Sequence, residues 1–193
     1  MRIWKIGYPE ENNDWVQMED VDCLFELEVL NGQPRIDEWG ERRLIGIAGT
    51  RPPLRSDSPR FSGRALVFSD RAKRCLADVL EGCVEWLPVT FHGESLWVAH
   101  VTRIVDCIDY DRAVFQLRES SGEIRGFLEY QFSEDLIRGI NCFGIPEERV
   151  GLPFVSEAFK RRVEECGLTG LKFKLVWDSE LPQGSIVFRT VCV

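Results

Sequence analysis

The sequence predicts an α+β fold whose main component is antiparallel sheet. Two patterns lead to this fold class: a run of strand-like segments joined by short turns, and two segments that each have the pattern of strand, helix and strand. The composition agrees, because 44% of the 193 residues are hydrophobic and 29% are charged, as in an ordinary globular protein. The 12 phenylalanines and 6 tryptophans supply ample material for a core.

Four segments in the middle of the chain predict an antiparallel meander of four strands. They are rich in β-branched and aromatic residues, and turn-forming sequences of hairpin length separate them. In the last segment apolar and polar residues alternate, apart from Phe127, which predicts that Leu128, Tyr130 and Phe132 share one face. The predicted strands are residues 84–91, 96–105, 113–118 and 124–132.

Two similar strand–helix–strand units flank the predicted meander. In each unit a serine that can cap a helix (Ser69 or Ser156) follows a short apolar strand. An acidic residue (Asp70 or Glu157) comes next, at the positive end of the helix dipole. Apolar side chains then recur at helical spacing, and a glycine marks the end of each helix. We expect both apolar stripes to pack in the core, and residues 185–193 to form a C-terminal strand.

Charge divides the chain into an N-terminal section, residues 1–60, and a main body, residues 61–193, which we expect to pack as one unit. Residues 1–28 carry eight acidic and two basic side chains. In residues 42–64, by contrast, six arginines accompany a single acidic residue, Asp57. This arginine-rich stretch also contains Pro-Pro and Ser-Pro pairs, which favour turns and extended chain, so we expect a surface loop there.

The sequence lacks the familiar motifs for catalysis, metal binding and cofactor binding. Its two histidines are His92, in a predicted turn, and His100, inside a predicted strand; no nucleophile elbow, zinc-binding pair or phosphate-binding loop occurs. The 7 cysteines are scattered, several of them among apolar neighbours, which suits buried side chains in a reducing compartment. The closely spaced Asp106, Asp109 and Asp111 fit a turn better than a calcium loop. We therefore predict no catalytic residue, no metal site and no cofactor.

The net charge of −8 argues against binding to nucleic acid or to anionic membranes. No apolar signal segment opens the chain and no apolar run is long enough to span a membrane, so we expect a cytoplasmic protein. The acidic segment near the N-terminus is either a solvated face or a patch that meets a basic partner surface.

Five segments of the main body, taken together, carry a resemblance to a known family. They are residues 63–73 (GRALVFSDRAK), 85–89 (EWLPV), 100–109 (HVTRIVDCID), 154–159 (FVSEAF) and 165–173 (ECGLTGLKF). As a set they resemble immunity protein family 11 (formerly domain of unknown function 1629) of bacterial polymorphic toxin systems. The resemblance spans roughly residues 60–177 and implies a protein that neutralises a cognate toxin by binding it. It carries over no catalytic residue.

The leading hypothesis is therefore an immunity protein, not an enzyme, that occludes a secreted toxin domain. The acidic side chains that we predict to contact the toxin are Asp14, Glu19, Asp20 and Asp22. One alternative is a small enzyme with an unrecognised acid–base pair, such as Asp106 with His100. Another is a structural or self-associating module that uses an exposed Trp15 or Trp39. The sequence leaves the oligomeric state and the identity of the toxin open.

Overall fold

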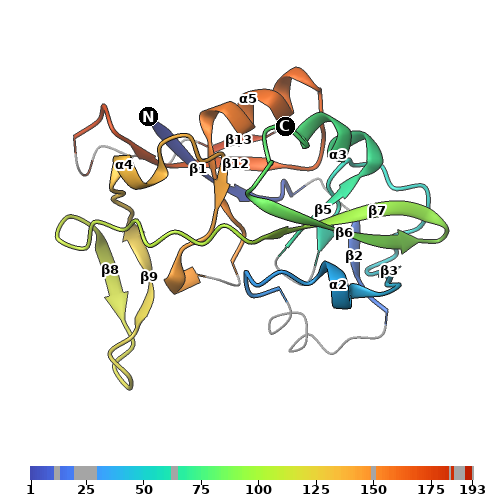
Figure 1. Ribbon diagram of the computed structural model, residues 1–193, viewed down its shortest axis with the longest axis horizontal. Coiled ribbons are helices and arrows are strands. Elements are labelled where there is room, and N and C mark those ends of the chain that lie inside the picture. Colours follow the sequence, from blue (N-terminus) through green and yellow to red (C-terminus); the bar gives the residue numbers. More distant parts are fainter. Residues whose placement is uncertain are drawn as a thin grey trace.

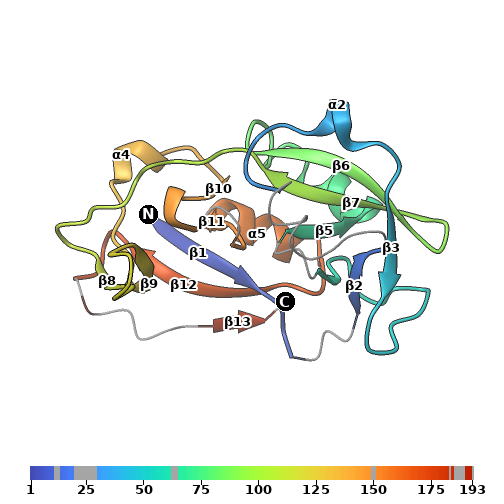
Figure 2. The ribbon, with the colours of Figure 1, turned by 90° about the horizontal axis from the view of Figure 1, so that it is seen from below.

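The computed structural model describes residues 1–10, 14–19, 30–61, 65–148, 151–182, 184 and 190–192. Within these residues it confirms the predicted α+β class, because short helices accompany sheets in which antiparallel pairing dominates (Figures 1 and 2). The helices are α2 (Ile36–Trp39), α3 (Asp70–Leu76), α4 (Glu134–Ile137) and α5 (Glu157–Glu165), with the 3-10 turn η1 at Pro146–Glu148.

One sheet has the strand order β10-β11-β1-β12-β13 and is antiparallel throughout. Its strands are β10 (Cys142–Phe143), β11 (Phe154–Ser156), β1 (Arg2–Gly7), β12 (Lys172–Asp178) and β13 (Thr190–Cys192). The N-terminal strand β1 occupies the centre, where Ile3, Trp4 and Ile6 are buried. Strand β13 lies within the predicted C-terminal strand, whose residues 185–189 and 193 are outside the described part of the chain.

A second sheet has the order β4-β2-β3-β6-β7-β5 and mixes parallel with antiparallel pairs. Its strands are β2 (Trp15–Met18), β3 (Arg43–Gly46), β4 (Arg60–Phe61), β5 (Leu66–Ser69), β6 (Val84–Phe91) and β7 (Glu94–Val101). The prediction of a surface loop at residues 42–64 is therefore wrong in part, since β3 and β4 fall inside it. Their buried side chains Leu44 and Phe61 tie them to the sheet.

The two predicted strand–helix–strand units are present and are built alike. In β5–α3–β6 and in β11–α5–β12, the two strands run parallel with one antiparallel strand between them, β7 in the first unit and β1 in the second. Both predicted serines cap their helices: Ser69 Oγ accepts from the Ala72 backbone N–H (3.1 Å), and Ser156 Oγ accepts from that of Phe159 (3.2 Å). The local sequence therefore predicted these helix starts correctly.

The strand in the middle of each unit also carries a tryptophan that binds the start of the helix. Trp97 donates its indole N–H to Asp70 Oδ1 (2.5 Å), and Trp4 donates to Glu157 Oε2 (2.8 Å). These acidic residues are the ones that the sequence analysis assigned to the helix N-termini. Each carboxylate therefore both complements its helix dipole and fixes the helix on its sheet.

Helices α3 and α5 pack against each other and share one hydrophobic core. Each helix supplies an arginine to the C-terminal end of the other: Arg162 donates to Cys75 O (3.0 Å), and Arg71 donates to Cys166 O (2.5 Å). Carbonyls at a helix end lack partners within the helix, so these bonds satisfy them. The two units are thus joined by reciprocal contacts between their helices.

The prediction of a continuous four-strand meander is wrong. Strands β6 and β7 form a hairpin of the second sheet, whereas β8 (Val114–Leu117) and β9 (Ile124–Glu129) form a separate two-stranded sheet. The chain turns away after β7 because the backbone N–H groups of Thr102 and Arg103 both donate to Cys83 O (3.1 and 3.2 Å). Residues beyond them cross to the other sheet before the second hairpin begins (Figure 1).

The alternation predicted for the last strand also fails. The register of β8 with β9 shifts twice, so that Arg125 and Leu128 are extra residues with no partner opposite them on β8. Such β-bulges break the two-residue period of a strand. As a result Leu128, predicted to lie on one face with Tyr130 and Phe132, is exposed while those two aromatic side chains are buried.

Candidate functional site

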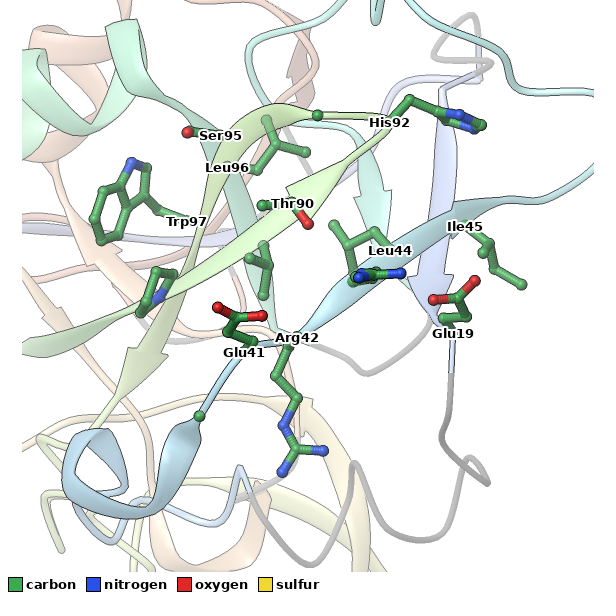
Figure 3. A pocket seen from close by; sticks show the side chains of 15 residues that line it. Glu19, Glu41, Arg42, Leu44, Ile45, Thr90, His92, Ser95, Leu96 and Trp97 are labelled. Atoms are coloured by element: carbon green, nitrogen blue, oxygen red, sulfur yellow. The ribbon is translucent and has the colours of Figure 1, made fainter.

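An open groove of about 750 Å³ lies over one end of the six-stranded sheet (Figure 3). It is bordered by the end of β2, by β3 and by the β6–β7 hairpin. The hairpin turns through two residues, His92 and Gly93, which have φ values of 48° and 86° as a tight hairpin turn requires. Next to it, β3 pairs with β6 over only two residues, Arg43 with Thr90 and Leu44 with Phe91.

The groove has an apolar base and a polar border. Leu44, Val89 and Leu96 line it and are buried. Charged and polar side chains of both signs also line it, namely Glu19, Glu41, Arg42, Arg43, Thr90, His92 and Ser95. An apolar base with charged borders is the usual composition of a protein-binding surface. A groove of this size and composition can take either a small molecule or a segment of another protein.

Helix α2, which ends directly before the groove residue Gly40, is fixed to β6 through Trp39. This side chain is buried, its indole N–H donates to Pro88 O on β6 (2.8 Å), and Arg42 stacks over its ring at 5.2 Å. The hypothesis that an exposed Trp39 mediates self-association is therefore wrong. Trp15, the other candidate, keeps an exposed side chain at the start of β2.

Asp14 has an internal role. Its side chain is buried, and Oδ2 accepts hydrogen bonds from the backbone N–H groups of Arg55 (2.6 Å) and Ser56 (2.7 Å) and from the Ser56 hydroxyl (3.0 Å). The Asp14 carbonyl also accepts from Arg60 N (2.7 Å). The carboxylate therefore holds the loop between β3 and β4 against the start of β2. Charge-assisted bonds of this kind are among the stronger ones in proteins.

Glu19 is the predicted contact residue that reaches the groove. It follows β2 directly, its backbone N–H donates to Arg43 O (2.9 Å), and its side chain is exposed at the border. Asp20 and Asp22 lie outside the described residues. Of the two predicted contact residues that are described, the structure thus brings one to the groove and places the other inside the protein.

His100 is buried between β6 and the segment before α2. Its Nε2 accepts the backbone N–H of Gly32 (3.1 Å), so Nδ1 carries the proton and faces Glu85 Oε2 at 3.5 Å. Glu85 in turn accepts the backbone N–H groups of Arg35 (2.7 Å) and Ile36 (2.9 Å). Burial lowers the pKa of His100 below its ordinary 6.5, which favours this neutral form.

These contacts exclude the acid–base pair suggested for Asp106 and His100. Both ring nitrogens of His100 are engaged by Glu85 and Gly32, and Asp106 is exposed elsewhere on the chain. No sequence pattern pointed to the actual partner, because Glu85 faces His100 only through the pairing of β6 with β7. The contacts make His100 a residue that fixes the backbone of residues 32–36.

Three cysteines are buried among apolar side chains, as predicted from their neighbours. They are Cys83, Cys107 and Cys142. Burial raises the pKa of Cys107 to about 12 and that of Cys142 well above its usual value, so neither thiol is a ready nucleophile. Across the described residues, no group of three or more histidine, cysteine and acidic side chains is placed to hold a metal ion. No described helix has the length and apolar character needed to cross a bilayer.

The fold and the groove define a class: an α+β protein with an open groove on its six-stranded sheet that has an apolar base and charged borders. A family model identifies it further, since the immunity protein family Imm11 matches residues 16–178. The chain therefore belongs to the immunity protein family Imm11. This confirms the resemblance seen in the main body and extends it into the N-terminal section. No curated protein matches the sequence.

Proposed function

We propose that the protein protects a bacterium by binding a cognate secreted toxin and covering the toxin's working surface. The observation that carries this proposal is the family match over residues 16–178. Immunity protein families are in general non-enzymatic, which agrees with binding as the mode of action. We further propose that the protein acts in the cytoplasm, where an incoming or newly made toxin would be met.

The structure suits inhibition by occlusion. A stable inhibitor needs a rigid surface of roughly 800 Å² per partner. Two sheets joined through α3 and α5 supply a rigid framework, and the groove beside the β6–β7 hairpin supplies a concave surface with an apolar base. Preformed surfaces lose little conformational entropy on binding, which favours tight complexes.

We propose that the acidic side chains at the start of the chain guide the toxin to this surface. Glu19 stands at the border of the groove, and Asp20 and Asp22 follow it in sequence. Together with the net charge of −8, they favour a basic toxin domain, and opposite charges raise association rates more than final affinity. Asp14 would contribute to toxin binding indirectly, by holding in place the loop between β3 and β4.

The experiment compares two variants in binding to a cognate toxin domain, which we expect to be the C-terminal domain of a secreted protein encoded by a neighbouring gene. The triple variant Glu19→Gln, Asp20→Asn, Asp22→Asn should associate about 10-fold more slowly at low salt, with the difference shrinking as salt screens the charges. Asp14→Asn should instead lower the stability of the free protein, which thermal unfolding measures. An unchanged association rate for the triple variant at low salt would remove the acidic side chains from the interface.

A further inference from the structure

The β8–β9 hairpin extends away from the rest of the protein (Figure 1). Its two strands pair with each other and with no other described strand, so no described strand covers either outer edge. A two-stranded hairpin is only marginally stable in water unless one face is packed. The contacts that anchor this hairpin therefore show which of its side chains pack against the protein and which remain exposed to a partner.

Aromatic side chains anchor the hairpin at its base. Phe115 on β8 and Phe127 on β9 lie opposite each other, with ring centroids 6.0 Å apart. The Phe127 ring stacks on Tyr130 at 5.0 Å, and Tyr130 contacts Phe154 of the five-stranded sheet at 5.1 Å. This chain of rings links the hairpin to the core and accounts for its fixed position.

Three large apolar side chains of the hairpin face solvent, whereas Ile124 is half-buried. Val114, Leu117 and Leu128 are 41%, 54% and 58% exposed; we call these three the hairpin surface. Two further exposed apolar side chains lie close by in the sequence, Tyr110 before β8 and Leu136 on α4. Exposed apolar side chains on strands whose edges no described strand covers favour aggregation unless a partner binds over them.

The net charge of the hairpin and of the segments that flank it in the sequence indicates the chemistry of that partner, although Asp109, Glu134 and Asp135 form ion pairs with Arg112 or Arg138. Residues 106–138 contain eight acidic and four basic side chains. The acidic residues are Asp106, Asp109, Asp111, Glu119, Glu123, Glu129, Glu134 and Asp135. A second copy of this chain would bring the same acidic excess against itself, whereas a surface bordered by lysine and arginine would be attracted.

We propose that the hairpin surface is a second toxin-contacting area and that it fits an apolar patch on the toxin bordered by basic residues. This inference rests on the proposed function and assigns that function to a second region, apart from the groove. Interface energy concentrates in a few apolar side chains from which water is excluded. The hairpin surface provides such side chains, and its acidic surroundings provide the outer ring.

The test measures binding of the cognate toxin domain to the wild-type protein and two variants. The double variant Leu117→Ser, Leu128→Ser should raise the dissociation constant at least about 30-fold, because it removes two apolar contacts from the proposed interface. Ile36→Ser is the matched control, since Ile36 is similarly exposed (47%) on α2 and does not line the groove, and it should change the constant less than about 2-fold. All three replaced side chains are exposed, so melting curves should stay close to the wild type.

A second variant tests the charge ring without touching the apolar side chains. Glu119→Lys, Glu123→Lys reverses two charges at the hairpin turn and should slow association about 10-fold at low salt. Full binding by both hairpin variants, with wild-type binding intact, would overturn the inference and leave the proposed function standing. Absence of binding by the wild type itself would overturn both. A wild-type dimer in sedimentation that Leu117→Ser, Leu128→Ser converts to monomer would identify a second copy as the occupant and also overturn the inference.

Discussion

The two hairpins of this protein have similar strand and turn patterns and very different surroundings. Hairpin β6–β7 pairs residue by residue from Val84 with Val101 to Phe91 with Glu94, inside a six-stranded sheet. Hairpin β8–β9 pairs over four positions, contains two bulges and stands alone among the described strands. Both were predicted as parts of one meander. The comparison teaches that turn and strand patterns specify local pairing, whereas burial decides whether a hairpin serves the core or faces solvent.

The largest expected difference between the hairpins concerns stability. Leu87 on β6 is fully buried, so Leu87→Ala should lower the free energy of unfolding by about 3 kcal/mol. Leu117 on β8 is mostly exposed, so Leu117→Ala should change it by less than about 0.5 kcal/mol. Urea unfolding followed by tryptophan fluorescence measures both. Similar losses for the two variants would mean that the hairpins are equally part of the core.

A smaller difference should depend on pH. His100 on β7 accepts the Gly32 N–H only while neutral, and burial lowers its pKa in the folded protein relative to about 6.5 in the unfolded chain. The unfolded chain therefore binds this proton more readily, so its contribution to stability is complete above pH 6.5. That contribution is lost as the pH falls below 6.5, with a slope of at most about 1.4 kcal/mol per pH unit.

Two observations check the pH prediction. His100→Gln should reduce the slope of unfolding free energy against pH between 6.5 and 5. Hydrogen exchange of the wild type in the same range should rise for residues 30–39 and for hairpin β6–β7, because Glu85 and His100 connect them. Hairpin β8–β9 should stay unaffected. An identical slope in the variant would show that the His100 contact does not contribute.

The smallest expected difference lies in the turns. Gly93 and Gly122 have φ values of 86° and 71°, so alanine at either position should cost about 1 kcal/mol locally. In hairpin β6–β7 this cost should appear in the global free energy of unfolding, because the hairpin lies within the core sheet. In hairpin β8–β9, Gly122→Ala should mainly increase hydrogen exchange of the hairpin itself. If Gly93→Ala and Gly122→Ala lowered the global free energy of unfolding equally, hairpin β8–β9 would not unfold separately from the core.

The features that the sequence predicted well are those fixed by neighbours in the chain. Ser69 and Ser156 cap their helices because a serine hydroxyl reaches the backbone three residues ahead, and the His92–Gly93 turn follows from its local composition. The family resemblance likewise rested on short segments. These features depend on contacts over a few residues, so they can be recognised without knowing the fold.

The features that were missed depend on residues far apart in sequence. Asp14 is buried because residues 55 and 56 return to it, and His100 meets Glu85 only when β6 pairs with β7. The bulges that expose Leu128 also arise from pairing and not from the strand's own pattern. At the groove, the sequence pointed to Glu19 through its charge but not to the apolar base, which three strands assemble.

Titration of the toxin's activity with this protein tests the central claim most directly. The cognate toxin domain is held at a fixed concentration while its activity is followed. The account predicts a linear loss of activity that ends at a fixed molar ratio, with a stable complex in size-exclusion chromatography. Loss of activity at far less than that ratio, without a complex and with a chemically altered toxin, would contradict binding and occlusion as the mechanism.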